Sequence, residues 1–388
     1  MSAKRASDCP NLDSPVPVTS TKLLRAYVDT TTLPVDLLLE IVVRSDAVTI
    51  VLCAAVSRPL RAAILDHGFR RRLARRGFDP SLLRGISYKL LGANRVVRLF
   101  QTLPPSQHIP DIRSKLASPC FEPVAWRDGI IVFRRSKFGS TEQLTVCDST
   151  TGQIISLPPL SVRENHYPPA LLTVDDNFEL LVADQDLGTR IYSSRNDCSG
   201  WSATRAAHHA VHPPPNPLRQ SNKHPVVIGH TVHWLCVLGW NSNCLLEAHD
   251  LHIVALDVDT ARATVIELPQ GCVSRMNGFK NINAITLAVS GTRLLSLVVS
   301  ETQVISMWSL AVGGGWSRRV LVDRQHWDMH HPVRFEGFGE RSGTLLFHIY
   351  HVGLVQLNLA TKEARLVGMS NPWKTNISQL CLHEVNLA

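Results

Sequence analysis

The sequence lacks the features that carry a chain into or across a membrane. It has no run of 18 apolar residues, and its opening residues, MSAKRASDCPNLDSPVPVTS, contain no apolar stretch typical of a secretory signal. None of its nine cysteines forms a C-x-x-C pair, and no zinc-ligand spacing occurs. We therefore expect a protein of the reducing cytoplasm and/or nucleus, with no membrane contact and no bound metal.

The common catalytic and nucleotide-binding fingerprints are also missing. There is no G-x-S-x-G elbow, no Walker-type phosphate loop and no G-x-G-x-x-G turn. Histidines occur at i, i+3 spacing, as in His230 and His233, but on a strand such residues point to opposite faces. We expect no catalytic residues and no cofactor, so the function should come from binding.

Excess positive charge is confined to one end of the sequence. Residues 1–110 hold 16 Lys+Arg against 8 Asp+Glu, whereas the remainder is neutral at 24 against 24. A nucleic-acid partner is not expected, because the large C-terminal region has no charge excess for phosphates. The basic run FRRRLARRG at 69–77 is interpreted as a solvated helix face, or one that meets an acidic adaptor surface.

The hydrophobic period changes along the chain and indicates two kinds of structure. Residues 1–30 are rich in Ser, Pro, Thr and Asp and are expected to form a flexible arm. Apolar residues in 33–100 recur at helical spacing, with Pro34 and Pro59 placed where first helical turns tolerate proline. From about residue 120 the period is two, which predicts strands. The strands are expected at 130–133, 143–148, 180–184, 252–259, 295–300, 304–310, 344–351 and 354–359, with a hairpin over 171–182.

A weak repeat within the strand-rich region favours a propeller-like arrangement. Three segments combine a strand, a polar turn containing Thr and a second strand, and two others carry Gly-Trp-Ser. The two types alternate, with their marker residues 45 to 59 positions apart, and such spacing suits propeller blades. The markers are Thr150, Trp201, Thr260, Trp316 and Thr361. A β-sandwich with recurring turns is the alternative, and the two tryptophans are expected to pack between strands.

One stretch near the N-terminus carries the strongest functional signal. Residues 33–60 read LPVDLLLEIVVRSDAVTIVLCAAVSRPL, with a Leu-Pro opening, a Leu-Leu pair, a Glu-Ile pair and, fifteen residues after Ile41, Val56. This register resembles the F-box, and the layout with a β-rich C-terminus is similar to the plant F-box family with F-box-associated domains. Ser45 and Leu60 depart from the pattern, which usually has an aliphatic residue and Trp there.

The resemblance implies docking on a Skp-type adaptor and, through it, on a cullin. A segment of about 40 residues buries too little core to cover its own apolar stripe, so partner helices would cover it. The alternative is that the stripe packs on helices farther along the chain. The residues that the resemblance assigns to adaptor binding are Leu33, Pro34, Leu37, Leu38, Ile41, Val51, Val56 and Leu60.

Together these features predict an α+β multidomain chain. We expect a flexible arm at 1–30, a small three-helix F-box at 31–75, a helical linker at 76–118 and an all-β, propeller-like recognition domain at 119–388. The expected function is substrate recognition in a Skp–cullin–F-box ubiquitin ligase, with an unknown target protein and no catalysis by this chain. The alternatives are a non-ligase interaction protein with a decayed F-box, and a propeller that binds a ligand or acts as an enzyme.

Overall fold

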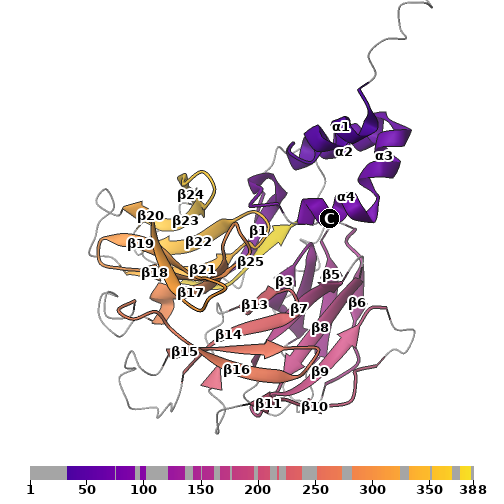
Figure 1. Cartoon of the computed structure of the whole chain (residues 1–388). Helices are drawn as coiled ribbons and strands as arrows, with labels where there is room; N and C mark the ends of the chain where they lie inside the picture. Colours follow the sequence, from indigo (N-terminus) through magenta and orange to yellow (C-terminus); the bar gives the residue numbers. More distant parts are fainter. Residues whose placement is uncertain are drawn as a thin grey trace, which may run out of the picture.

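The computed structural model contains a small helical unit beside a large β-domain (Figure 1). The structure describes residues 33–74, 76–91, 97–101, 121–135, 143–149, 151–160, 167–174, 177–195, 200–209, 216–217, 224–237, 251–272, 282–323, 332–349, 352–368 and 376–385. The flexible arm expected at 1–30 lies outside these residues. Among the described residues, no helix is long and apolar enough to cross a membrane.

Four short α-helices form the helical unit, one more than the three expected. They are α1 (Val35–Val42), α2 (Ala47–Val56), α3 (Arg58–Ile64) and α4 (His67–Ala74). Local chemistry sets their starts: the Asp46 carboxylate accepts a hydrogen bond from the Thr49 amide at 2.9 Å, and the Ser57 hydroxyl accepts one from the Leu60 amide at 3.4 Å. Pro59 occupies the first turn of α3, as predicted.

Strands joined by turns make up most of the remaining described chain, which also has two short 3-10 helices, η1 (Pro80–Leu82) and η3 (Ile282–Ala284). Every strand expected from the period of two is present. In chain order they are β1 (Leu83–Leu91), β2 (Val97–Gln101), β3 (Phe121–Arg127), β4 (Ile130–Arg135), β5 (Gln143–Asp148), β6 (Ile154–Ser156), β7 (Tyr167–Val174), β8 (Asn177–Ala183), β9 (Gly188–Ser193), β10 (Arg205–Ala206), β11 (His208–His209), β12 (Asn216–Pro217), β13 (Val226–Ile228), β14 (Thr231–Val237), β15 (Leu251–Asp257), β16 (Arg262–Glu267), β17 (Ile285–Val289), β18 (Leu295–Ser300), β19 (Val304–Leu310), β20 (Trp316–Asp323), β21 (Val333–Phe338), β22 (Thr344–Ile349), β23 (Gly353–Asn358), β24 (Ala364–Gly368) and β25 (Asn376–Glu384). The predicted hairpin over 171–182 is β7 paired with β8.

These strands build a propeller-like ring with five blades. Four blades are four-stranded sheets of consecutive strands, β3–β6, β7–β10, β17–β20 and β21–β24, and the fifth contains β11–β16. Neighbouring blades contact one another in order: β3 contacts β7, β7 contacts β12, β13 and β14, β13 and β14 contact β17, and β17 contacts β21. Strand β25 contacts both β21 and β3, which closes the ring. Apolar residues of neighbouring sheets pack together between the blades. The predicted propeller-like fold is therefore confirmed.

A sixth, three-stranded sheet joins the two ends of the β-domain. It has the order β2-β1-β25, so the last strand of the chain pairs with the first strand of the domain (Figure 1). The helical linker predicted at 76–118 is therefore wrong for residues 83–91 and 97–101, which are strands. The physical reason is non-local: β1 is held by β25, whose residues lie almost 300 positions later. Residues 102–118 lie outside the described part of the chain.

The alternating repeat corresponds to equivalent turns in alternate blades. The outer hairpins of three blades share an Asp or Asn whose side chain accepts a hydrogen bond from the amide of a Thr three residues later. The position after that Thr has positive φ, at 72° for Gly152, 55° for Ala261 and 63° for Lys362. The repeat is confirmed, with one correction: Thr151, rather than Thr150, is the counterpart of Thr260 and Thr361.

The two Gly-Trp-Ser segments occupy matching places in the other two blades. The Trp201 indole donates a hydrogen bond to the Pro158 carbonyl at 3.0 Å, and the Trp316 indole donates one to the Glu267 carbonyl at 3.2 Å. In each case the acceptor belongs to the preceding blade: Pro158 follows β6, and Glu267 is the last residue of β16. Both tryptophans are partly buried and pack against neighbouring sheets, as predicted.

Candidate functional site

The helical unit has a small core of its own. Val42 from α1, Val43 directly after it, Ile50 from α2, Ile64 from α3, and Phe69 and Leu73 from α4 are all buried together. Leu60 packs partly against this cluster. The core uses one side of each helix, and the opposite sides of α1 and α2 remain open.

The open side of α1 and α2 is strongly apolar and forms the first candidate site. Of fifteen exposed large apolar residues in the described chain, nine lie between 33 and 65. They include five of the residues expected to bind the adaptor, with 50% of Leu33, 53% of Leu37, 56% of Ile41, 50% of Val51 and 81% of Val56 exposed. We call this surface the apolar helical face; it comprises Leu33, Val35, Leu37, Ile41, Val48, Val51, Leu52 and Val56.

Helix α2 shows why this face is unusual. Its sequence, AVTIVLCAAV, is apolar on every side, and such a helix is normally buried on every side. Here Ala47 and Ile50 are buried, while Val48, Val51 and Leu52 are exposed. Within the described residues, the chain's own downstream helices do not cover these side chains. A partner surface would remove them from water, which is the usual meaning of a contiguous apolar patch.

Leu33 and Pro34 are exposed ahead of α1. The other two expected adaptor residues, Leu38 and Leu60, are only partly exposed. Val48 and Leu52 belong to the same face but match no position of the family register, so the sequence comparison did not select them. The sequence feature that could have identified them is their i, i+4 spacing, which places both side chains on one side of a helix.

An ion-pair cluster joins α1 to α4. Glu40 of α1 binds both Arg44, at 2.8 Å, and Arg72 of α4. These two guanidinium groups lower the pKa of the Glu40 carboxyl, with the Arg72 hydrogen bond as the largest cause. Arg71 of the basic run is exposed on α4, as expected for a solvated helix face.

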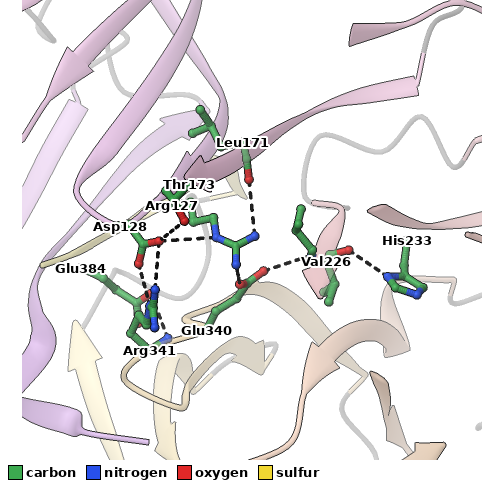
Figure 2. Close-up of polar contacts among 10 residues, drawn as sticks. Arg127, Asp128, Leu171, Thr173, Val226, His233, Glu340, Arg341 and Glu384 are labelled. Carbon is green, nitrogen blue, oxygen red and sulfur yellow. Dashed lines mark hydrogen bonds and ion pairs between the residues drawn. The ribbon is translucent and has the colours of Figure 1, made fainter. Parts of the chain in front are cut away.

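A second candidate site lies inside the ring, where polar side chains from several sheets meet (Figure 2). Asp128 follows β3, has positive φ and is 1% exposed at its side chain. Arg341, from the turn between β21 and β22, donates hydrogen bonds to it at 2.7 and 3.2 Å, and the Thr173 hydroxyl donates a third at 2.7 Å. We call this set, with the residues described next, the channel network.

Further contacts extend the channel network to the remaining sheets. Arg127 reaches Glu340 at 3.3 Å and donates to the Leu171 carbonyl at 3.4 Å. Glu340 also accepts from the Val227 amide at 3.4 Å. Glu384 of β25 accepts from the amides of Arg341 and Ser342 at 3.3 and 2.8 Å.

Charge in the channel network is balanced rather than accumulated. Burial alone would raise the pKa of Asp128, but Arg341, then Arg127 and Thr173, lower it to about 2. Burial raises the pKa of Glu384. Arg293 belongs to the same cluster: burial and then Arg341 lower its pKa, while Glu340 opposes them. The cluster thus contains three guanidinium and three carboxyl groups, so it has no excess of basic groups that would bind an anion.

The cavity beside the network is small. It is lined by residues including Trp126, His224, Thr286 and Phe338, and its volume is about 30 Å³. That volume has room for roughly two water molecules. The network therefore joins the sheets to one another. The sequence reasoning missed it, since its members lie up to 257 positions apart.

Comparison with known proteins adds a family but no activity. No curated protein matches the chain. One solved structure that resembles it is described as a Mycobacterium tuberculosis puromycin-hydrolyzing peptidase, with 9% identity and a TM-score of 0.38. The match covers 64% of this chain and 39% of that one, so this chain corresponds to less than half of that protein, and a similarity this weak supports no functional argument.

The fold and sites define an α+β chain with short N-terminal helices and a five-bladed, propeller-like β-domain. The chain belongs to the family described as "Domain of unknown function (DUF7595)", whose model matches residues 85–388. That match begins within β1, so it includes both strands that had been expected to form a helical linker.

Proposed function

We propose that this chain is the substrate-recognition subunit of a Skp–cullin–F-box E3 ubiquitin ligase. It would dock a Skp-type adaptor, and through it a cullin, by the apolar helical face, and hold a target protein by the β-domain. The observation that carries the proposal is the exposure of Leu37, Ile41, Val51 and Val56 on helices whose sequence has the F-box register. Apolar helix faces of this kind are stable when they fit a partner's groove.

The proposed role is positional and needs no catalytic group in this chain. Holding target lysines near a ubiquitin-charged enzyme raises their effective concentration there. The charged groups of the channel network bind one another, which supports an architectural role for them. Cytoplasm or nucleus is the proposed location, because adaptor, cullin and target would meet there.

The proposal is tested by capture of the full-length chain on a purified Skp-type adaptor. The double substitution Leu37→Asp with Ile41→Asp should abolish capture, because it places charges in the centre of the docking surface. Both side chains are more than half exposed, so the helical unit should remain folded. Val312→Asp is the matched control, since Val312 is 97% exposed on the β19–β20 turn and should not affect capture. Equal capture of the double variant and the wild type would refute adaptor docking at this face.

A second candidate function is an interaction protein whose F-box no longer engages a ligase. The observation that favours it is the position of Leu60, which packs partly against the helical core, where the family pattern has an anchoring Trp. Absence of wild-type capture, together with intact folding, would favour this candidate over the ligase role.

A further inference from the structure

The segment between the helical unit and the ring, residues 76–82, is attached to the β-domain along most of its length. Phe78 packs on the apolar cluster between the β17–β20 and β21–β24 blades, and its ring meets that of Phe338 edge-on at a centroid distance of 6.1 Å. A Cβ atom on Gly343 would overlap the aromatic ring of Phe78, so glycine is required at position 343 for the Phe78 side chain to pack there. Gly343 also has a φ of +64°, which favours glycine.

The backbone of the same segment is bonded to the channel network. The Asp79 amide donates a hydrogen bond to the Arg341 carbonyl at 3.0 Å, and the Val385 amide donates one to the Leu82 carbonyl at 3.0 Å. Arg341 is itself held by Asp128 and by Glu384. The linker thus rests on the buried charges that join the first and last blades.

At its other end the segment is tied to the helical unit. The Arg76 guanidinium donates to the Ser45 carbonyl at 2.5 Å and lies 4.0 Å from the Asp79 carboxylate. Ser45 follows α1, which contributes Leu37 and Ile41 to the apolar helical face. One chain of contacts therefore runs from that face, through Arg76 and Asp79, to Arg341.

We propose that residues 76–82 form a rigid mount, with Phe78 as the positioning residue, that fixes the direction of the apolar helical face relative to the ring. The mount itself follows from the contacts within this chain. Its consequence, a fixed geometry between adaptor and target, rests on the proposed function. A flexible tether would allow a target lysine to sample many positions, whereas a mount restricts it to few.

Hydrogen–deuterium exchange and small-angle X-ray scattering of the full-length chain test this proposal. Phe78→Ala should raise exchange of the amides in 76–82 by roughly tenfold or more and enlarge the maximum dimension, because the ring no longer anchors the linker. Exchange in β21–β25 should stay as in the wild type. Unchanged exchange and scattering would refute the mount, and loss of protection throughout β21–β25 would show that Phe78 serves the ring's stability instead.

Two glycine variants supply a matched pair. Gly343→Ala should release the linker as Phe78→Ala does, whereas Gly291→Ala should not, since its methyl group would lie at an ordinary 3.8 Å from the Phe78 ring. Identical exchange of the linker in both variants would contradict the seat proposed for Phe78. Adaptor capture by Phe78→Ala separates the two proposals, because the apolar helical face is intact in it. If the adaptor does not capture the wild-type chain but the linker of that chain is protected from exchange, only the ligase role is rejected.

Discussion

The guanidinium of Arg341 donates two hydrogen bonds to the carboxylate of Asp128, at 2.7 and 3.2 Å, across 213 positions of sequence. The pair joins the last blade to the first, beside β25. The Asp128 side chain is 1% exposed and that of Arg341 14%, so removing one of them leaves the other charge in the interior without its strongest partner.

Arg341→Met should therefore lower the free energy of unfolding by about 3–5 kcal/mol. Denaturant unfolding followed by tryptophan fluorescence measures this change. Asp259→Ala is the control: it removes the His230–Asp259 contact of 3.1 Å, which is exposed and should contribute less than about 1 kcal/mol. Similar losses in the two variants would show that the Arg341–Asp128 pair does not hold the ring closed.

Stability should fall as the pH is lowered from 6.5 towards 4. Burial lowers the pKa of His383 to about 4, and burial likewise lowers that of His233 to about 4, despite its contact with the Val226 carbonyl. The unfolded chain then binds protons that the folded chain does not, so each histidine stabilises the fold above pH 6.5 and loses that contribution as the pH falls.

Each histidine should add about 1.4 kcal/mol per pH unit to the slope of unfolding free energy in this window. His383→Gln should reduce the slope by that amount, His233→Gln by a similar amount, and the double variant by their sum. The opposite contribution of Glu384 is common to all four proteins and cancels. Urea unfolding at a series of pH values provides the measurement, and a slope that is equal in all four proteins would contradict the prediction.

Adaptor docking should extend beyond the residues of the F-box register. Leu52 is 57% exposed on the same face of α2 as Val48, so Leu52→Asp should weaken adaptor binding by roughly tenfold or more without loss of helical structure. Titration of full-length protein with labelled adaptor gives the affinity. Leu366→Asp, at an exposed apolar residue of β24, is the control. Unaltered affinity in Leu52→Asp would confine the interface to the register positions.

The equivalent outer turns predict opposite effects at equivalent positions. Lys362 adopts a φ of +63°, which costs a residue with a side chain about 1–2 kcal/mol, and its side chain is exposed. Lys362→Gly should therefore stabilise the protein by up to about 1 kcal/mol, whereas Gly152→Ala should destabilise it by a similar amount. Thermal unfolding measures both, and a change of the same sign in the two variants would show that backbone strain does not control these turns.

Local patterns in the sequence were sufficient for most of the fold. Alternation predicted strands such as β18 and β22, and the Ser57–Pro59 pair predicted the start of α3, because both signals depend on neighbours within a few residues. The same period of two occurs in 83–91, where Ile86 and Tyr88 alternate with polar residues, although the region around it is predicted to be helical. Nothing local revealed that β25 would pair with this segment.

The two candidate sites also differ in whether local sequence patterns can reveal them. The register of residues 33–60 selected Leu37 and Ile41, which lie exposed on the apolar helical face. It could not select the channel network, because Asp128, Glu340 and Glu384 become neighbours only when the ring closes. Burial and ion pairing of such distant residues depend on topology, which residue spacing along the chain does not encode.

The pairing of β1 with β25 also sets an order of events during synthesis. Leu83 pairs with Glu384, so the first strand of the β-domain has no permanent partner on that edge until β25 has emerged from the ribosome. At translation rates of about 5–20 residues per second, this interval lasts roughly 15–60 s. The helical unit, made before the β-domain, would be available to the proposed adaptor throughout that time, while the unclosed ring exposes edges that chaperones would need to protect.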